Sequence, residues 1–222
     1  MQKKALMKLK GRKTNTPQRN ALAVRLKEAR RLDRNSLSPT LEKPGYGVSF
    51  NAHVNQLRYY YQRDFVGSIE HHRLQNPKNY RVLEVGCGGG KAANELKGNI
   101  FRIIGGKIKV TATGTRRLPV WEQYAKNVDF HVAHAENLSH VFAPNSFNFI
   151  HSNLGIGNTK NPKKALFECH KLLRKNGRLL FTSEIPVVIP RKLYKKIEVK
   201  RVKIKVYDQF EVLLNVYYLE KI

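Results

Sequence analysis

Residues 82–97 read VLEVGCGGGKAANELK, and this stretch decides the fold of the chain. Its first residues are apolar and β-branched and predict a short buried strand, whereas the residues from Lys91 onward predict a helix. The turn between them is rich in glycine, which lets the backbone adopt positive φ and approach a ligand closely. Because open α/β sheets bind ligands at the carboxyl ends of their strands, we expect this turn to hold one.

Two familiar kinds of glycine turn do not fit these residues. A dinucleotide fingerprint, G-x-G-x-x-G, would need a glycine where Lys91 stands. A phosphate-binding P-loop needs Ser or Thr after its lysine, and Ala92 occupies that position. The pattern that remains is E-x-G-x-G-x-G, in which Glu84 lies two residues before Gly86. A carboxylate at this strand end is suited to bracing the loop or to meeting the cationic part of a ligand.

The residues after Tyr80 predict strands and helices in alternation. We expect strands over 81–86, 107–113, 128–135, 146–153, 178–184, 199–207 and 210–222. We expect helices over 91–98, closed by Gly98, and over 119–127, 161–177 and 191–198. Repeated alternation of this kind predicts an α/β fold, with a mostly parallel sheet covered by helices on both faces.

Upstream of this core the sequence predicts one long helix, a linker and a basic arm. Apolar residues recur at steps of three and four over residues 52–73, which predicts a helix whose tyrosines pack on the sheet or cover a bound ligand. Residues 36–47 are rich in Pro, Gly and Ser and read as a linker. We therefore divide the chain into a basic N-terminal extension and linker, 1–45, and one domain, 46–222, with a helical cap over 46–78 and a core over 79–222.

Over residues 80–184 the sequence resembles the class I S-adenosylmethionine-dependent methyltransferases. VLEVGCGGG resembles their first motif, and HAENL, 134–138, resembles the segment that lines the adenine pocket. Residues 142–181 resemble the part of the family that holds the fourth strand, the next helix and the turn before strand five. The resemblance implies a Rossmann-like, doubly wound, mostly parallel seven-stranded sheet with an antiparallel final strand.

The resemblance also implies which residues hold S-adenosyl-L-methionine. The methionine part would lie against the glycine loop, the adenine beside the segment after strand three, and the ribose near the end of strand two. Residue by residue, the cofactor set is Glu84, Gly86, Cys87, Gly88, Gly90, Thr113, Thr115, Ala135, Glu136 and Asn153. His151 is the candidate general base, since an imidazole titrates near neutrality. Cysteine and histidine show no metal-ligand spacing, so no metal is expected.

The sequence departs from the family at the end of the second strand. Family members place an Asp or Glu there, which accepts hydrogen bonds from the ribose hydroxyls. This chain has no acid between Glu95 and Glu122, and only the hydroxyls of Thr113 and Thr115 are near that position. A neutral hydrogen bond is roughly half as strong as a charge-assisted one. The departure leaves open a second hypothesis, in which the fold is kept and catalysis is lost.

Composition bears on the partners and on the compartment. The formal net charge is +26 and the pI is about 10.3, which favours RNA, DNA or an anionic surface as a partner. Of these we expect RNA or a ribonucleoprotein, bound through the basic N-terminal arm and a basic surface. The two cysteines lie far apart, and the sequence shows neither a secretion signal nor a membrane span, which favours an intracellular, reducing compartment. The cytoplasm is favoured, with a mitochondrial presequence as the alternative because the arm is Arg-rich and poor in acids. The sequence does not indicate an oligomeric state.

Three functions stay open at this point. The first is an S-adenosylmethionine-dependent methyltransferase with an unassigned substrate, associated with RNA or a ribonucleoprotein. The second is an inactive methyltransferase-like protein that binds RNA or a ribonucleoprotein. The third is a small-molecule or protein methyltransferase whose charge is incidental. The sequence lacks the N/D-P-P-Y/F motif of amino-methylating nucleic-acid enzymes, since HSNLG, 151–155, stands in its place.

Overall fold

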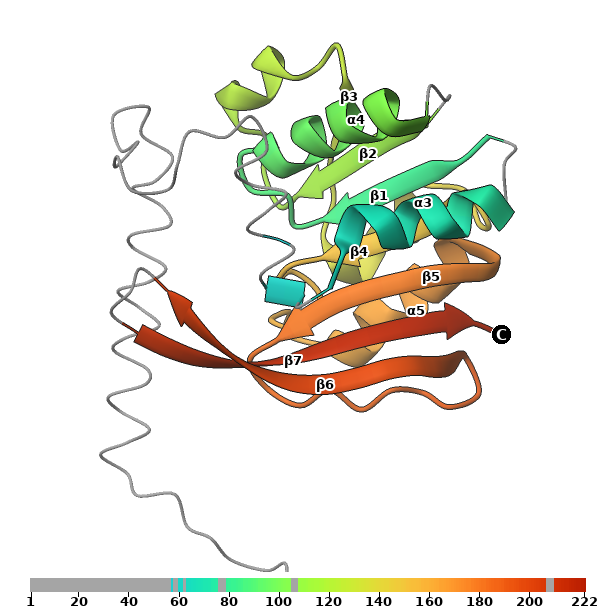
Figure 1. Ribbon diagram of the computed structural model, residues 1–222, viewed down its shortest axis with the longest axis vertical. Coiled ribbons are helices and arrows are strands. Elements are labelled where there is room, and N and C mark those ends of the chain that lie inside the picture. The colour runs from blue at the N-terminus through green and yellow to red at the C-terminus, as the bar shows by residue number, and fades with distance from the viewer. Residues whose placement is uncertain (1–56, 58–59, 62, 76–78, 105–107, 207–209) are drawn as a thin grey trace, which may run out of the picture. The chain divides into compact units, whose positions relative to one another are not determined.

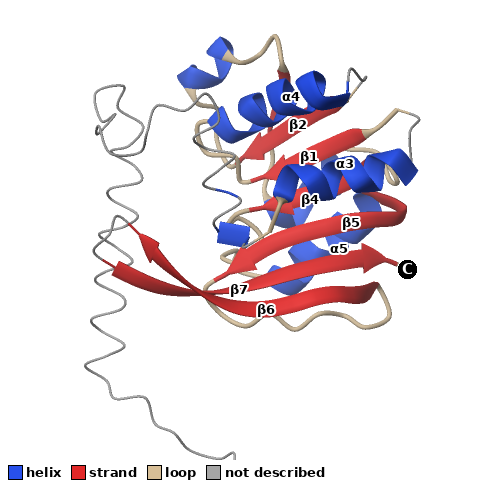
Figure 2. Cartoon of the chain, in the orientation of Figure 1, coloured by secondary structure: helices blue, strands red, loops and turns tan. Residues whose placement is uncertain are grey.

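A computed structural model describes residues 57, 60–61, 63–75, 79–104, 108–206 and 210–222 (Figure 1). The predicted basic extension, 1–45, lies outside the described residues, as does much of the predicted cap, 46–78. The division into extension, cap and core therefore stays a prediction. The rest of the chain folds into one sheet with helices on both faces (Figure 2).

Seven strands form a single sheet in the order β3-β2-β1-β4-β5-β7-β6. The strands β1 to β5 run parallel to one another, and β7 runs antiparallel to both β5 and β6. The predicted Rossmann-like sheet with an antiparallel final strand is confirmed. The bounds are β1 Arg81–Val85, β2 Lys109–Gly114, β3 Val128–Val132, β4 Phe147–Ser152, β5 Leu173–Ser183, β6 Tyr194–Val206 and β7 Phe210–Lys221.

The two faces of the sheet carry separate apolar cores. On one face α3 (Phe65–Gln75) and α4 (Lys91–Ile104) cover Val82, Val110 and Phe149, and on the other α5 (Pro162–Leu172) covers Leu83 and Ile150. In Figure 1 α3 and α4 lie in front of the sheet and α5 behind it. Neighbouring strand residues point to opposite faces, so strands that are apolar throughout are buried on both sides.

Two predicted helices are wrong. Residues 119–127 form only a short 3-10 turn, η1 (Pro119–Gln123), in which the Trp121 N–H donates to Leu118 O and the Tyr124 N–H to Trp121 O. Most of residues 191–198 belong to the edge strand β6, because Tyr194 and the residues after it pair along β7. Hydrogen bonds to β7, the next strand of the chain, outweigh the local helical preference there.

Two predicted helix ends are also wrong. Helix α4 continues through Gly98 to Ile104, because apolar residues recur beyond the glycine and nothing in the fold stops the helix there. Helix α5 ends at Leu172 rather than near Gly177, since Leu173 already pairs with Phe147 in the sheet. Asn176, within β5, adopts φ +61°. Asparagine tolerates this left-handed conformation better than most residues.

The expected long helix over 52–73 is interrupted. The described residues show helix at Tyr60 and Tyr61, a break at Arg63 and Asp64, and then α3 from Phe65. The Asp64 side chain accepts from the Gly67 N–H at 3.1 Å, as an N-terminal capping residue does. The predicted packing of a tyrosine on the sheet is confirmed for Tyr61, which is completely buried.

Candidate functional site

The glycine turn lies where the sheet changes direction. From β1 the chain winds outward through β2 and β3, and β4 then returns to the other side of β1. Ligands of doubly wound sheets bind at this switch point, outside the carboxyl ends of the strands. Two segments face each other across it, the turn after β1 and the loop that follows Ser152 at the end of β4.

Neighbouring segments hold the glycine turn in shape. The N–H groups of Gly86 and Cys87 both donate to Thr113 O, at 2.9 and 2.8 Å. The indole N–H of Trp121 donates to Gly88 O at 2.8 Å. Gly86, Gly88 and Gly90 have φ values of +80°, +52° and +78°. These positive values explain the glycines, because a side chain destabilises such a backbone.

The glycines differ in what lies beside them. A Cβ added at Gly90 would lie 2.5 Å from the Phe130 ring, and one at Gly86 would lie 3.1 Å from Gly155 Cα. A Cβ added at Gly88 would meet no protein atom within 4 Å. Protein packing therefore requires glycine at 86 and 90, whereas the space beside Gly88 is free for a ligand.

Glu84 is the most unusual ionisable group of the switch point. Its side chain is 4% exposed, and its Oε2 atom has no hydrogen-bond partner among the described residues. Burial raises the pKa of this carboxyl to about 8. An ionised carboxylate without a partner is costly to bury, and a cationic ligand would remove that cost.

His151 lies on β4 directly beside Glu84 on β1. Its Nδ1 atom is 3.4 Å from the Tyr61 hydroxyl, and its ring packs edge-on against Phe65 with the centroids 4.7 Å apart. Its Nε2 atom has no partner among the described residues, and burial lowers the pKa of the imidazole to about 3. Glu84, His151 and Tyr61 thus form a buried polar cluster beneath the start of the cap, and His151 is neutral at pH 7.

The loop after β4 is held by side-chain hydroxyls. Ser152 donates to Val85 O at 2.7 Å and accepts from the Ile156 N–H at 2.9 Å. Thr182 at the end of β5 donates to Asn153 Oδ1 at 2.8 Å and accepts from the Leu154 N–H at 3.0 Å. These bonds fix the loop of Asn153 opposite the glycine turn.

A family model described as a methyltransferase domain matches residues 83–181. The chain is 28% identical over 103 residues to the ubiquinone biosynthesis O-methyltransferase of Aromatoleum aromaticum, covering 46% of this chain and 43% of that protein. It is 31% identical over 121 residues to the ubiquinone/menaquinone biosynthesis C-methyltransferase UbiE of Rhizobium meliloti, covering 51% of this chain and 45% of that protein. The chain thus spans less than half of the length of these two relatives.

A solved S-adenosylmethionine-dependent methyltransferase from Methanosarcina mazei has the same fold. It superposes with a TM-score of 0.52 at 14% identity, covering 65% of this chain and 93% of that chain. Residues 83–181 thus match a methyltransferase domain, and the fold is that of the S-adenosylmethionine-dependent methyltransferases.

The ribose side of the methyltransferase site carries hydroxyls and no carboxylate. The Thr113 side chain is fully buried and its hydroxyl lies 3.4 Å from Glu84 O, so it braces β1. Thr115 is exposed beyond the end of β2. Of the two threonines proposed for the ribose, the structure therefore leaves only Thr115 accessible.

The adenine side is tied to α5. Ala135 is largely buried at the start of the turn η2 (Ala135–His140). Glu136 Oε1 accepts from the N–H of Asn161, the residue that caps α5, at 2.8 Å. Glu136 thus anchors this segment. Cys87 is buried in the glycine turn, and burial raises the pKa of its thiol.

Sequence reasoning placed a tyrosine of residues 52–73 on the sheet, but it missed three side-chain contacts that shape the site. Trp121 holds the glycine turn, Tyr61 contacts His151, and Thr182 fixes the loop after β4. Trp121 is the single tryptophan of the chain, which was a usable signal. The other two contacts join residues that are distant in sequence and left no local pattern.

Two further expectations concern metals and membranes. Among the described residues, no group of three or more His, Cys, Asp or Glu side chains is placed to hold a metal ion. Within the same residues, no helix is long and apolar enough to cross a membrane. Cys87 and Cys169 are both free thiols.

Proposed function

We propose that the chain binds S-adenosylmethionine at the glycine turn and transfers its methyl group to a small-molecule acceptor. The observation that carries this proposal is the buried Glu84 carboxyl at the end of β1, whose Oε2 atom has no hydrogen-bond partner among the described residues, next in sequence to a turn with open space at Gly88. The ligand that fits must be cationic and must lie against bare backbone. S-adenosylmethionine has a positive sulfonium and a protonated amine, and it supplies an activated methyl group when bound.

The residues of the switch point would divide the work. Glu84 would accept from the amine, and the backbone beside Gly88 would lie against the methionine part. Asn153 on the loop after β4 would lie beneath the sulfonium, and the exposed Thr115 hydroxyl would be available to the ribose. Methyl transfer is an in-line displacement, for which holding the two partners in place contributes much of the rate.

A base role for His151 stays a prediction. An acceptor that must lose a proton needs a nearby base, and the most effective base has a pKa near the working pH. The pKa of about 3 makes buried His151 a weak base beneath Tyr61 and Phe65. The structure therefore favours an acceptor that is nucleophilic without a strong base.

The relatives support a small molecule as the acceptor. Both are named for methylation steps in quinone biosynthesis. An RNA or ribonucleoprotein partner, bound through the basic arm, stays a prediction because the arm lies outside the described residues. A protein acceptor has no observation in its favour.

A second candidate function rests on β2. That strand ends at Gly114 without the carboxylate that family members place there. A chain that binds the cofactor weakly, or has lost the transfer step, would serve as a binding protein with the methyltransferase fold.

Calorimetry and a transfer assay separate the two functions. S-adenosylhomocysteine should bind the full chain, and Gly88→Leu should abolish its binding because the side chain enters the open space. The matched control is Lys163→Leu, an exposed position on α5. No heat at millimolar ligand refutes the cofactor site. Binding without transfer of labelled methyl to any small-molecule pool favours the inactive protein.

A further inference from the structure

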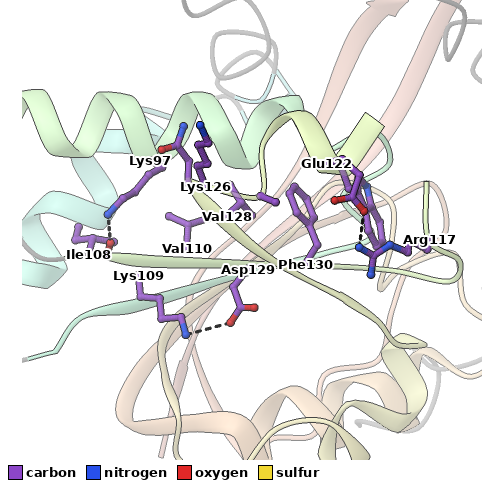
Figure 3. A pocket seen from close by; sticks show the side chains of 13 residues that line it. Lys97, Ile108, Lys109, Val110, Arg117, Glu122, Lys126, Val128, Asp129 and Phe130 are labelled. Carbon is purple, nitrogen blue, oxygen red and sulfur yellow. Dashed lines mark hydrogen bonds and ion pairs between the residues drawn. The ribbon is translucent and has the colours of Figure 1, made fainter. Parts of the chain in front are cut away.

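A groove opens on the sheet face beside α4, away from the switch point. The β2–β3 connection there contains the short turn η1 instead of a covering helix. A cavity of about 500 Å³ results, with Val110, Val128 and Phe130 on its floor (Figure 3). Small-molecule sites typically occupy roughly 300–1,000 Å³. The cavity therefore has the size and the apolar floor of a ligand site.

The charged side chains that line this groove carry a net positive charge. Lys109 pairs with Asp129 at 3.1 Å and Arg117 pairs with Glu122, so these four charges compensate one another. Figure 3 shows the Lys109–Asp129 pair on the side of the strands opposite Val110.

Two lining cations are left without a carboxylate. Lys97 donates to the carbonyl oxygen of Ile108, which leaves its charge uncompensated. Lys126 is exposed and has no ion-pair or hydrogen-bond partner among the described residues. A ligand that complements the groove is therefore an anion with an apolar part.

The wall of the groove is shared with the glycine turn. Trp121 and Phe130 stack with their centroids 4.9 Å apart and an interplanar angle of 13°. The same Trp121 donates to Gly88 O, and the same Phe130 would be struck by a Cβ at Gly90. A ligand that displaces this aromatic pair would therefore also displace the glycine turn.

We propose that the groove between α4 and β3 is a second ligand site, which takes a small organic anion with a flat apolar group and is coupled to the glycine turn through Trp121. The apolar ring lies against the partly buried Phe130, above the buried Val110 and Val128, and the anionic group lies near Lys97 and Lys126. Only the coupling rests on the proposed cofactor site; the binding stands by itself.

The probe for the binding test is anilinonaphthalene sulfonate, which joins two aromatic groups to an anion. Trp121 is the single tryptophan, so quenching of its emission reports on this groove. We expect one saturable site in the cofactor-free chain. Phenylnaphthylamine has the same rings without the sulfonate and should bind at least about tenfold more weakly, because the attraction to two cations is lost. Equal binding of the two probes overturns an anion site.

Variants then locate the probe. Lys126→Glu reverses one exposed charge and should weaken sulfonate binding about tenfold, whereas Lys163→Glu on α5 should leave it unchanged. Ala125→Phe fills the groove from an exposed lining position and should remove the quenching. Unchanged binding in Lys126→Glu and Ala125→Phe, with a native melting transition, overturns the site.

The coupling needs a separate measurement. Saturating anilinonaphthalene sulfonate should change the affinity for S-adenosylhomocysteine at least about threefold. S-adenosylhomocysteine should change the affinity for the probe by the same factor. Trp121→Phe should bring this factor to one. Binding of both ligands without mutual effect overturns the coupling. If S-adenosylhomocysteine does not bind, both the coupling and the cofactor proposal are refuted. The probe titrations still test whether the groove binds a ligand.

Discussion

Replacing Glu84 by glutamine tests the central feature of the site. The carboxyl is buried beside the glycine turn with a pKa of about 8. At pH 7 only about one tenth of the cofactor-free chain carries the ionised form. If the cationic ligand binds the ionised form, its affinity at pH 7 is about tenfold below the limit reached at high pH, a difference of about 1.4 kcal/mol.

The glutamine variant separates this effect from other titrations. A hydrogen bond to a charged group contributes about 1.5–3 kcal/mol, so Glu84→Gln should weaken binding by roughly ten- to a hundredfold at pH 9. At pH 7 the penalty should be about tenfold smaller, because the native carboxyl must first lose its proton there. The ratio of the two dissociation constants therefore rises with pH. Because the amine of the ligand has its own pKa near 8, the ratio is more informative than either constant alone.

Calorimetry with S-adenosylhomocysteine, in two buffers of different ionisation enthalpy, measures the dissociation constant and the number of protons released on binding. The native chain should release about 0.9 proton on binding at pH 7 and about 0.1 at pH 9, relative to Glu84→Gln. Glu211→Gln, an exposed position on β7, serves as the matched control and should behave as the native chain does. A dissociation-constant ratio that does not change between pH 6.5 and 9, or proton release equal in the two chains, would refute the assignment of Glu84.

Three other results follow from the same geometry. In the absence of ligand, Glu84→Gln should stabilise the chain at pH 8.5 by at most about 5 kcal/mol and have little effect near pH 4.5. The reason is that a carboxyl with a raised pKa lowers the stability of the native chain as pH rises from 4.5 to 8, and thermal melts at both pH values check this. Gly90→Ala should destabilise the fold by about 2–5 kcal/mol through contact with Phe130 and a left-handed φ, whereas Gly88→Ala, with open space beside it, should cost about 1–2 kcal/mol; chemical denaturation that ranks them the other way contradicts the packing. Trp121→Phe keeps an aromatic ring but loses the bond to Gly88 O, so S-adenosylhomocysteine should bind about fivefold more weakly to the folded variant, and the melting temperature should fall because Trp121 is buried. Unchanged affinity would show that the bond does not shape the site.

The sequence predicted the framework of the site more reliably than its details. The glycine turn and the strand before it are local features, and the structure contains both. The lack of an acid after β2 is also local, because it is read directly from the sequence. The alternation of strands and helices was enough to predict the doubly wound sheet, because periodicity reports which faces are buried. The helix predicted over 191–198 failed because β7 competes for the same backbone.

What only the tertiary structure decided is the environment of each side chain. The pKa of Glu84 near 8 depends on its burial, and the enclosure of the His151 ring depends on contact with Tyr61, ninety positions away. The groove beside α4 lies where the β2–β3 connection forms the short turn η1 instead of a longer helix. The sequence by itself determined a methyltransferase-like glycine turn at the switch point of a parallel sheet, since conformational preference and periodicity are local properties. The charge state of that turn's carboxyl and the aromatic wall behind it arise from burial, which requires contacts between residues far apart in the chain.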